Sequence, residues 1–182
     1  MSGGHGHVDH HGNKGVALLI SVLALVLAFS ETLGKGAQTA ALSYNIEASN
    51  LWAFFQAKTI RQTVLRTAAE EMEAGSSSEN AKKQVSKWRD TAQRYQNEPE
   101  TGEGRDQLAA RAKEAEKKRD RSFAAYHHYE LASAVVQIAI VLASASIITA
   151  MTPLVWAAGA LGVVGVVFSV IGFFFPTAVH LF

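Results

Sequence analysis

Residues 131–175 read LASAVVQIAIVLASASIITAMTPLVWAAGALGVVGVVFSVIGFFF, and this stretch decides the fold. It contains no Asp, Glu, Lys or Arg, and neither does the remainder of the chain to residue 182. So long an apolar segment cannot be hidden inside a protein of 182 residues, whereas a helix of about 20 apolar residues crosses the roughly 30 Å of hydrocarbon in a bilayer. The stretch therefore predicts membrane-spanning helices.

Pro153 divides this stretch into two predicted spans, Leu131–Met151 and Leu154–Phe175. Proline disfavours helical geometry in the residue before it and is common in the first turn of a new helix. We therefore expect a tight hairpin of two membrane helices, followed by a short tail at residues 176–182.

The first predicted span comes earlier, at residues 15–34, and carries a single charged residue that is three residues from its end, Glu31. This carboxylate must lie near the headgroups or face a partner, such as His127 or His128. The alternative is a cleaved signal peptide with Lys14 as its basic region. The sequence thus predicts an all-α membrane protein with three transmembrane helices.

Nearly all charged residues lie in the segment that separates the first span from the second. The chain has 17 Lys and Arg against 16 Asp and Glu, a net charge of +1. Basic residues crowd the approach to the second span, namely Lys113, Lys117, Lys118, Arg119 and Arg121. The positive-inside rule then predicts an N-terminus outside the cell and residues 35–130 in the cytoplasm. The chain has no cysteine, which excludes disulfides and thiolate chemistry.

The segment between the spans is predicted to be helical and coiled-coil-like. Residues 35–104 are expected to form a helical hairpin region, with a break at residues 75–79 where Ser76 and Glu79 fit a capping box. A loop is expected at residues 97–104, which contain both Pro and Gly.

The second span is predicted to continue a long stalk helix. Residues 105–151 contain neither Pro nor Gly, so residues 105–130 and the span at 131–151 are expected to form one helix. The seam of the stalk is narrow and weakly apolar, and such a helix needs partners, either the shorter helices of its own chain or copies of itself.

Small residues recur at spacings of three and four in both hairpin helices, which predicts close helix packing. These candidate packing residues are Ala139, Ala143, Ser146, Ala158, Gly162, Gly165, Ser169 and Gly172. A second face holds Ser133, Gln137 and Ser144. Gln137 is expected to bond a neighbouring helix, and the alternative is that this face lines a transport path.

Two groups of histidines are candidate metal ligands. His5, His7, His10 and His11 lie in a His/Gly-rich flexible tail, residues 1–14, where imidazoles can bind Zn, Ni or Cu ions loosely. His127 and Glu130 are one helical turn apart, but no second such pair accompanies them, so we expect an interfacial role instead. No cofactor motif is present in the sequence, and no nucleic-acid-binding face is expected.

The stretch NIEASNLWAFFQAKTIRQ at residues 45–62 resembles an uncharacterised bacterial membrane-protein family, domain of unknown function 4337. The resemblance extends to the His/Gly-rich start, the early span and the C-terminal hairpin. It implies a bacterial membrane location, for which we expect the inner membrane, and it supplies no catalytic residues. The residues of the stretch that carry it are Asn50, Trp52, Gln56, Lys58 and Arg61.

The aromatic part of this stretch allows two interpretations. Trp52, Phe54 and Phe55 either pack against the other cytoplasmic helices, or lie on the membrane surface with the basic residues toward anionic lipid. The glycines at residues 34 and 36 would then provide the bend out of the first span.

These features predict a non-enzymatic membrane protein that acts as a homo-oligomeric scaffold or as an accessory subunit of a larger membrane complex. An oligomeric channel or transporter-like conduit is the first alternative. The second is a metal-handling protein that uses the N-terminal histidines. The expected partners are the lipid bilayer and further copies of the chain.

Overall fold

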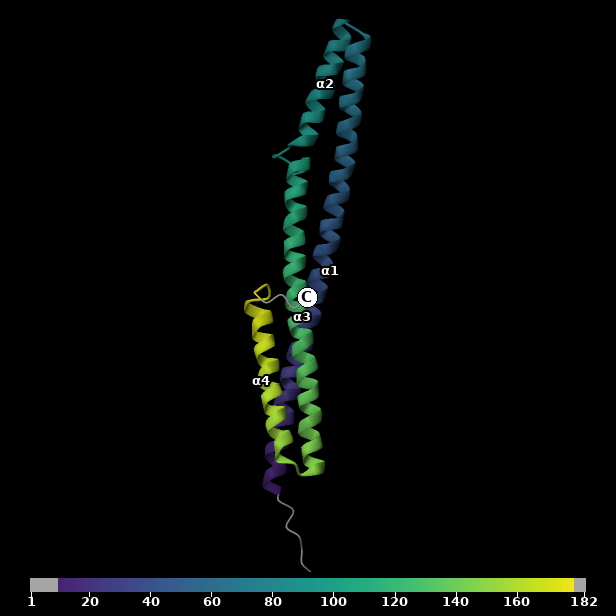
Figure 1. Cartoon of the computed structure of the whole chain (residues 1–182). Helices are drawn as coiled ribbons and strands as arrows, with labels where there is room; N and C mark the ends of the chain where they lie inside the picture. The colour runs from purple at the N-terminus through teal and green to yellow at the C-terminus, as the bar shows by residue number, and fades with distance from the viewer. Residues whose placement is uncertain (1–9, 179–182) are drawn as a thin grey trace, which may run out of the picture. The chain divides into compact units, whose positions relative to one another are not determined.

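The computed structural model describes the backbone of residues 10–178 and the side chains from Lys14 onward. This part of the chain folds into four α-helices and contains no strand, and three of the helices are long and apolar enough to cross a membrane (Figure 1). The predicted all-α fold with three candidate spans is therefore confirmed. The helices are α1 (His10–Gly75), α2 (Glu79–Gln96), α3 (Arg105–Thr149) and α4 (Thr152–Phe174).

The chain divides into two compact units. One comprises Met1–Ala40 and Arg121–Phe182, and we call its described part the membrane unit because it contains the three apolar segments. The other comprises Ala41–Asp120 and is called the charged unit.

The membrane unit packs the first part of α1 against the second part of α3 and against α4. Its core is formed by Leu23 from α1, by three residues of α3 and by Ala158 from α4. The three α3 residues are Val136, Ala139 and Ala143. The large apolar side chains on the outer faces of these helices remain exposed, for example Ile148 at 87% and Val163 at 65%, as expected for helices whose solvent is lipid.

A very short connection joins the two hairpin helices. α3 ends at Thr149, and Ala150 has φ +54°. α4 begins at Thr152, with Pro153 in its first turn and Met151 at its N-cap. Pro153 therefore marks the start of α4. The N–H groups in the first turn of a helix have no acceptor within the helix, so a proline at this position costs no hydrogen bond.

α1 is not interrupted at the two glycines where a bend was expected. It is helical from His10 to Gly75 and so passes through Gly34 and Gly36. A Cβ atom on Gly34 would lie 3.4 Å from the Cβ atom of Tyr129 on α3. Gly34 thus allows α1 and α3 to approach closely, and this packing compensates for the low helix propensity of glycine.

The charged unit packs the second part of α1 against α2 and the first part of α3. Trp52 and Phe55 contact its buried cluster, which supports the interpretation that they pack against other helices. The buried residues of this cluster are Ala48, Leu51, Leu108, Ala112 and Ala115. The Trp52 indole also donates a 2.9 Å hydrogen bond to Glu116.

The N-cap of α2 differs from the prediction. Ser78, not Ser76, caps the helix, and its hydroxyl accepts a hydrogen bond from the backbone N–H of Ala81 at 3.2 Å. The predicted pair of Ser76 and Glu79 was therefore wrong. Glu79 is already the first helical residue, so the cap falls on the serine directly before it.

Candidate functional site: a polar groove between two membrane helices

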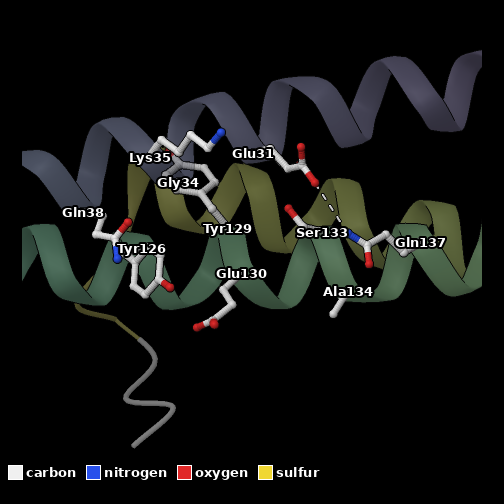
Figure 2. A pocket seen from close by; sticks show the side chains of 11 residues that line it. Glu31, Gly34, Lys35, Gln38, Tyr126, Tyr129, Glu130, Ser133, Ala134 and Gln137 are labelled. Carbon is white, nitrogen blue, oxygen red and sulfur yellow. Dashed lines mark hydrogen bonds between the residues drawn. The ribbon is translucent and has the colours of Figure 1, made fainter.

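A groove of about 490 Å³ lies between α1 and α3 in the membrane unit (Figure 2). Each helix contributes residues at helical spacing, so that one face of each helix lines the groove. Those from α1 are Ser30, Glu31, Gly34, Lys35 and Gln38. Those from α3 are Tyr126, Tyr129, Glu130, Ser133, Ala134 and Gln137.

Glu31 and Gln137 are the polar contact across this groove. Figure 2 shows the two side chains pointing toward each other, and the amide of Gln137 donates a long hydrogen bond of 3.5 Å to the carboxylate. Both residues are exposed, although Gln137 lies within the charge-free run that begins at Leu131. The partner of Glu31 is therefore Gln137 and not one of the two histidines considered from the sequence.

A second polar contact ties α1 to α4 behind the groove. The hydroxyls of Ser30 and Ser169 lie 2.9 Å apart, and Ser30 is 1% exposed. Ser169 also donates to the carbonyl of Gly165 at 3.0 Å. Because a hydroxyl has one hydrogen, Ser30 must be the donor to Ser169. This bond satisfies both groups inside the protein, where lipid offers none.

The small-residue stripe of α4 packs within the chain. A Cβ atom on Gly162 would overlap Leu23 of α1, and one on Gly165 would overlap Val136 of α3. Ala139, Ala143 and Ala158 are fully buried, and Gly172 is also buried. Ser146 is buried with its hydroxyl donating to the carbonyl of Ala143 at 2.6 Å, and Ser169 is half-buried. The stripe therefore packs α4 against α1 and α3 of the same chain.

The second predicted face of α3 is divided between the interior and the surface. Ser133 is 9% exposed, whereas Gln137 and Ser144 are exposed. The hydroxyl of Ser144 donates to the carbonyl of Ile140 at 2.8 Å, within its own helix. Glu31 of α1 contacts this face through its hydrogen bond with Gln137, at the groove.

The two adjacent histidines of α3 have different surroundings. His128 is 1% exposed, and its Nε2 lies 3.3 Å from the carbonyl of Pro176. Since a carbonyl only accepts, Nε2 is the donor in this contact, and the buried Nδ1 has no hydrogen-bond partner among the described residues. His127 Nδ1 lies 3.6 Å from a carboxylate oxygen of Glu130.

The structure brings no metal-binding cluster together. From Lys14 to residue 178, no group of three or more His, Cys, Asp or Glu residues is arranged to hold a metal ion. The side chains of His5, His7, His10 and His11, the candidate ligands from the sequence, lie outside the described residues.

In the charged unit, Lys58 of the family-like stretch is buried. It is 5% exposed, and its ammonium lies 3.4 Å from Glu98 and 3.8 Å from Glu103. The rings of Phe54 and Tyr95 each lie with their centres 5.4 Å from it. The loop after α2 thus folds over α1 and supplies the carboxylates that compensate for the buried charge.

The rest of the family-like stretch is less enclosed. Trp52 is half-buried, whereas Asn50, Gln56 and Arg61 are exposed.

The hydrogen bond from Arg94 is the main cause that lowers the pKa of Glu98 below its ordinary 4.5, and the bond from Lys58 acts in the same direction.

Sequence reasoning missed a second polar contact in this unit. The Gln62 side chain is 2% exposed, and its amide donates to the backbone carbonyl of Ala92 at 2.9 Å and to Gln96 at 3.2 Å. Arg105 donates to the side-chain oxygens of both glutamines and lies over the Phe55 ring, 4.9 Å from its centre. The only available signal was spacing, since Gln62 lies four residues after Lys58 on the same face of α1.

The fold defines the class of protein: an all-α chain with three helices that are long and apolar enough to span a membrane, and with a charged helical unit. Within that class, the chain belongs to the family described as domain of unknown function (DUF4337), whose family model matches residues 12–175. This confirms the family suggested by the sequence. No curated protein and no solved structure matches the chain.

We expect Gly165→Leu to lower the unfolding free energy of the membrane unit by about 2 kcal/mol, because the new side chain overpacks the contact with Val136. Val163→Leu is the matched control, since Val163 is 65% exposed, and it should change stability by less than about 0.5 kcal/mol. Thermal unfolding of both variants in mild detergent measures the difference. Equal stability would mean that α4 does not pack through its stripe.

Lys58→Ala should lower the unfolding free energy by about 2 kcal/mol, because it removes a long buried side chain, while Glu98 keeps Arg94 as a partner. Lys58→Met should cost less, since an unbranched side chain of similar length still fills the space beside Phe54 and Tyr95. The exposed Arg61→Ala is the control, and chemical denaturation monitors all three variants. A loss for Lys58→Ala no larger than that for the control would contradict the burial of this side chain.

Proposed function

We propose that this protein is a non-enzymatic, homo-oligomeric scaffold of the membrane, or an accessory subunit of a larger membrane assembly. The observation that carries the proposal is the exposed Glu31 carboxylate beside Gln137 in the groove between two apolar helices. We assign no catalysis to the groove, since its amides and hydroxyls are the groups with which membrane helices bond one another.

The position of Glu31 makes an uncovered groove costly. Gln137 lies six residues beyond Leu131, which is about 9 Å along α3 at 1.5 Å per residue. A charged side chain deep in hydrocarbon costs about 3 kcal/mol on insertion scales and more by other measures. Among residues 14–178, Gln137 gives Glu31 its only hydrogen bond, and that bond is 3.5 Å long. A partner that covers the groove removes the remaining cost.

A second copy of the chain fits this requirement. The groove carries both signs of charge and two amides, from Glu31, Lys35, Gln38, Glu130 and Gln137. A surface with both donors and acceptors can pair with itself across a two-fold axis. The small-residue stripe of α4 is already used inside the chain, so the groove is the better assembly surface.

We place the assembly in the bacterial inner membrane, with the N-terminus outside and the charged unit in the cytoplasm. The support is the cluster of basic residues that precedes the second span, together with the absence of Lys and Arg from residues 131–182.

A conduit through an oligomer is the second candidate function. It is favoured by the polar line that Gln137 and Ser144 make with Glu31, because a carboxylate inside a membrane commonly marks a cation or proton path. In that arrangement the groove would face a central path instead of a neighbouring chain.

Native mass measurement of the protein extracted together with its lipids tests the proposal. We expect an oligomer, and we expect Glu31→Ala to raise its dissociation constant about 5- to 30-fold, equivalent to an interhelical hydrogen bond of about 1–2 kcal/mol. Glu70→Ala, on the exposed surface of α1 in the charged unit, is the control.

A wild-type protein that is monomeric in lipid would contradict the scaffold. An oligomer that leaks cations from vesicles, with the leak abolished by Glu31→Gln, would favour the conduit instead.

A further inference from the structure

In the charged unit, α1 carries a second apolar face that no helix covers within residues 10–178. Its large residues are Leu42, Ile46, Ile60 and Val64, which are 59%, 53%, 65% and 61% exposed. Ala53 and Ala57 are also exposed and lie between them on the same side of the helix at roughly 100° per residue. We call the residues from Leu42 to Val64 on this side the outer stripe. It extends for roughly 33 Å along the helix.

The outer stripe is distinct from the face that builds the core of the charged unit. That core face holds Ala48, Leu51 and Ala69, which are 3%, 8% and 1% exposed. Ala48 follows Ile46 by two residues, so the two faces lie about half a turn apart. A helix in water is normally apolar on one face only, and a helix that is apolar on two faces has two neighbours.

We propose that the outer stripe pairs with the outer stripe of a second copy as a parallel coiled coil. This inference rests on the proposed homo-oligomer and adds to it an interface in the charged unit. Two copies inserted in one bilayer with the same orientation present their α1 helices in parallel, so that equivalent residues meet.

The charges of α1 favour a second copy over a different protein. In a parallel self-pair each residue faces its own copy, and a charge on the seam would face an identical charge. Between Leu42 and Val64 the charged residues are Glu47, Lys58 and Arg61, and none lies on the stripe. Lys58 is buried on the core face. The residues that border the stripe on one side are uncharged, namely Asn45, Ser49, Gln56 and Thr63, and on the other side it is bordered by Asn50 and by the exposed Arg61.

The composition of the stripe also argues against the membrane surface as its neighbour. The interfacial aromatics Trp52 and Phe55 are turned inward, onto the cluster that contains Leu108. The stripe itself has no Lys or Arg to meet anionic lipid. Small alanines at its centre and larger residues toward its ends instead suit the close approach of a second helix.

Disulfide trapping tests this pairing directly, because the natural chain has no cysteine. Single-cysteine variants Ser49→Cys and Ala53→Cys lie at or beside the seam, where equivalent Cα atoms of a parallel pair come within the roughly 4.4–6.8 Å that a disulfide requires. Ser43→Cys and Glu47→Cys, exposed on the same helix but about a quarter to a third of a turn away, are the controls. We expect the first two to form covalent dimers in membranes under mild oxidation, at least ten times more than the controls.

A second pair of variants tests the energetics without relying on oxidation. Ile60→Lys should weaken the dimer at least tenfold, since it places two like charges on the seam. Ser43→Lys should leave the dimer unchanged. Both residues are exposed in the single chain, and circular dichroism checks that each variant keeps its helix content.

The outcomes separate this inference from the proposed function. An oligomer in native mass measurement with no preference for the seam cysteines, and with no effect of Ile60→Lys, would overturn the outer-stripe pairing and leave the groove as the interface. A monomer would overturn both. Trapping of a different protein by Ala53→Cys, or protection of the stripe only by lipid vesicles, would also overturn the pairing with a second copy.

Discussion

Hydrocarbon offers a polar group no hydrogen-bond partner, and the membrane unit is organised around this constraint. The hydroxyl of Ser30 bonds Ser169 on another helix, and the hydroxyl of Ser146 bonds a backbone carbonyl of its own helix. Both hydroxyls are thus satisfied where they lie. Glu31 differs, because the one hydrogen bond that it accepts among the described residues, from Gln137, is 3.5 Å long. In the proposed oligomer, a partner covers this carboxylate.

The same constraint explains why glycine and alanine dominate the interior of this unit. Apolar surface does not drive helices together in lipid, so contact depends on close backbone approach. Gly162 and Gly165 give α4 that approach to α1 and α3. The interior of the charged unit instead contains Leu108 and the buried Lys58 with its carboxylate partners, and Trp52 packs against it. One chain therefore uses two kinds of core.

The sequence was sufficient for features that depend on local chemistry. The absence of charge after Glu130 predicted the hairpin, and Pro153 marked its turn. The burial of Lys58 was not predictable, because it depends on the loop at residues 97–104 folding back over a distant helix. The unbroken course of α1 through Gly34 depends likewise on the contact with α3. Such long-range contacts leave no periodic signal within a single helix.

We expect the outer faces of the hairpin helices to contact lipid and the charged unit to contact water. Spin labels on Val163→Cys in α4 and on Ser77→Cys in the loop before α2 test it most directly in reconstituted vesicles. The account predicts that the first label collides mainly with oxygen, which concentrates in hydrocarbon, and that the second collides mainly with a water-soluble nickel complex. Ready access of nickel to the label at residue 163 would contradict the account.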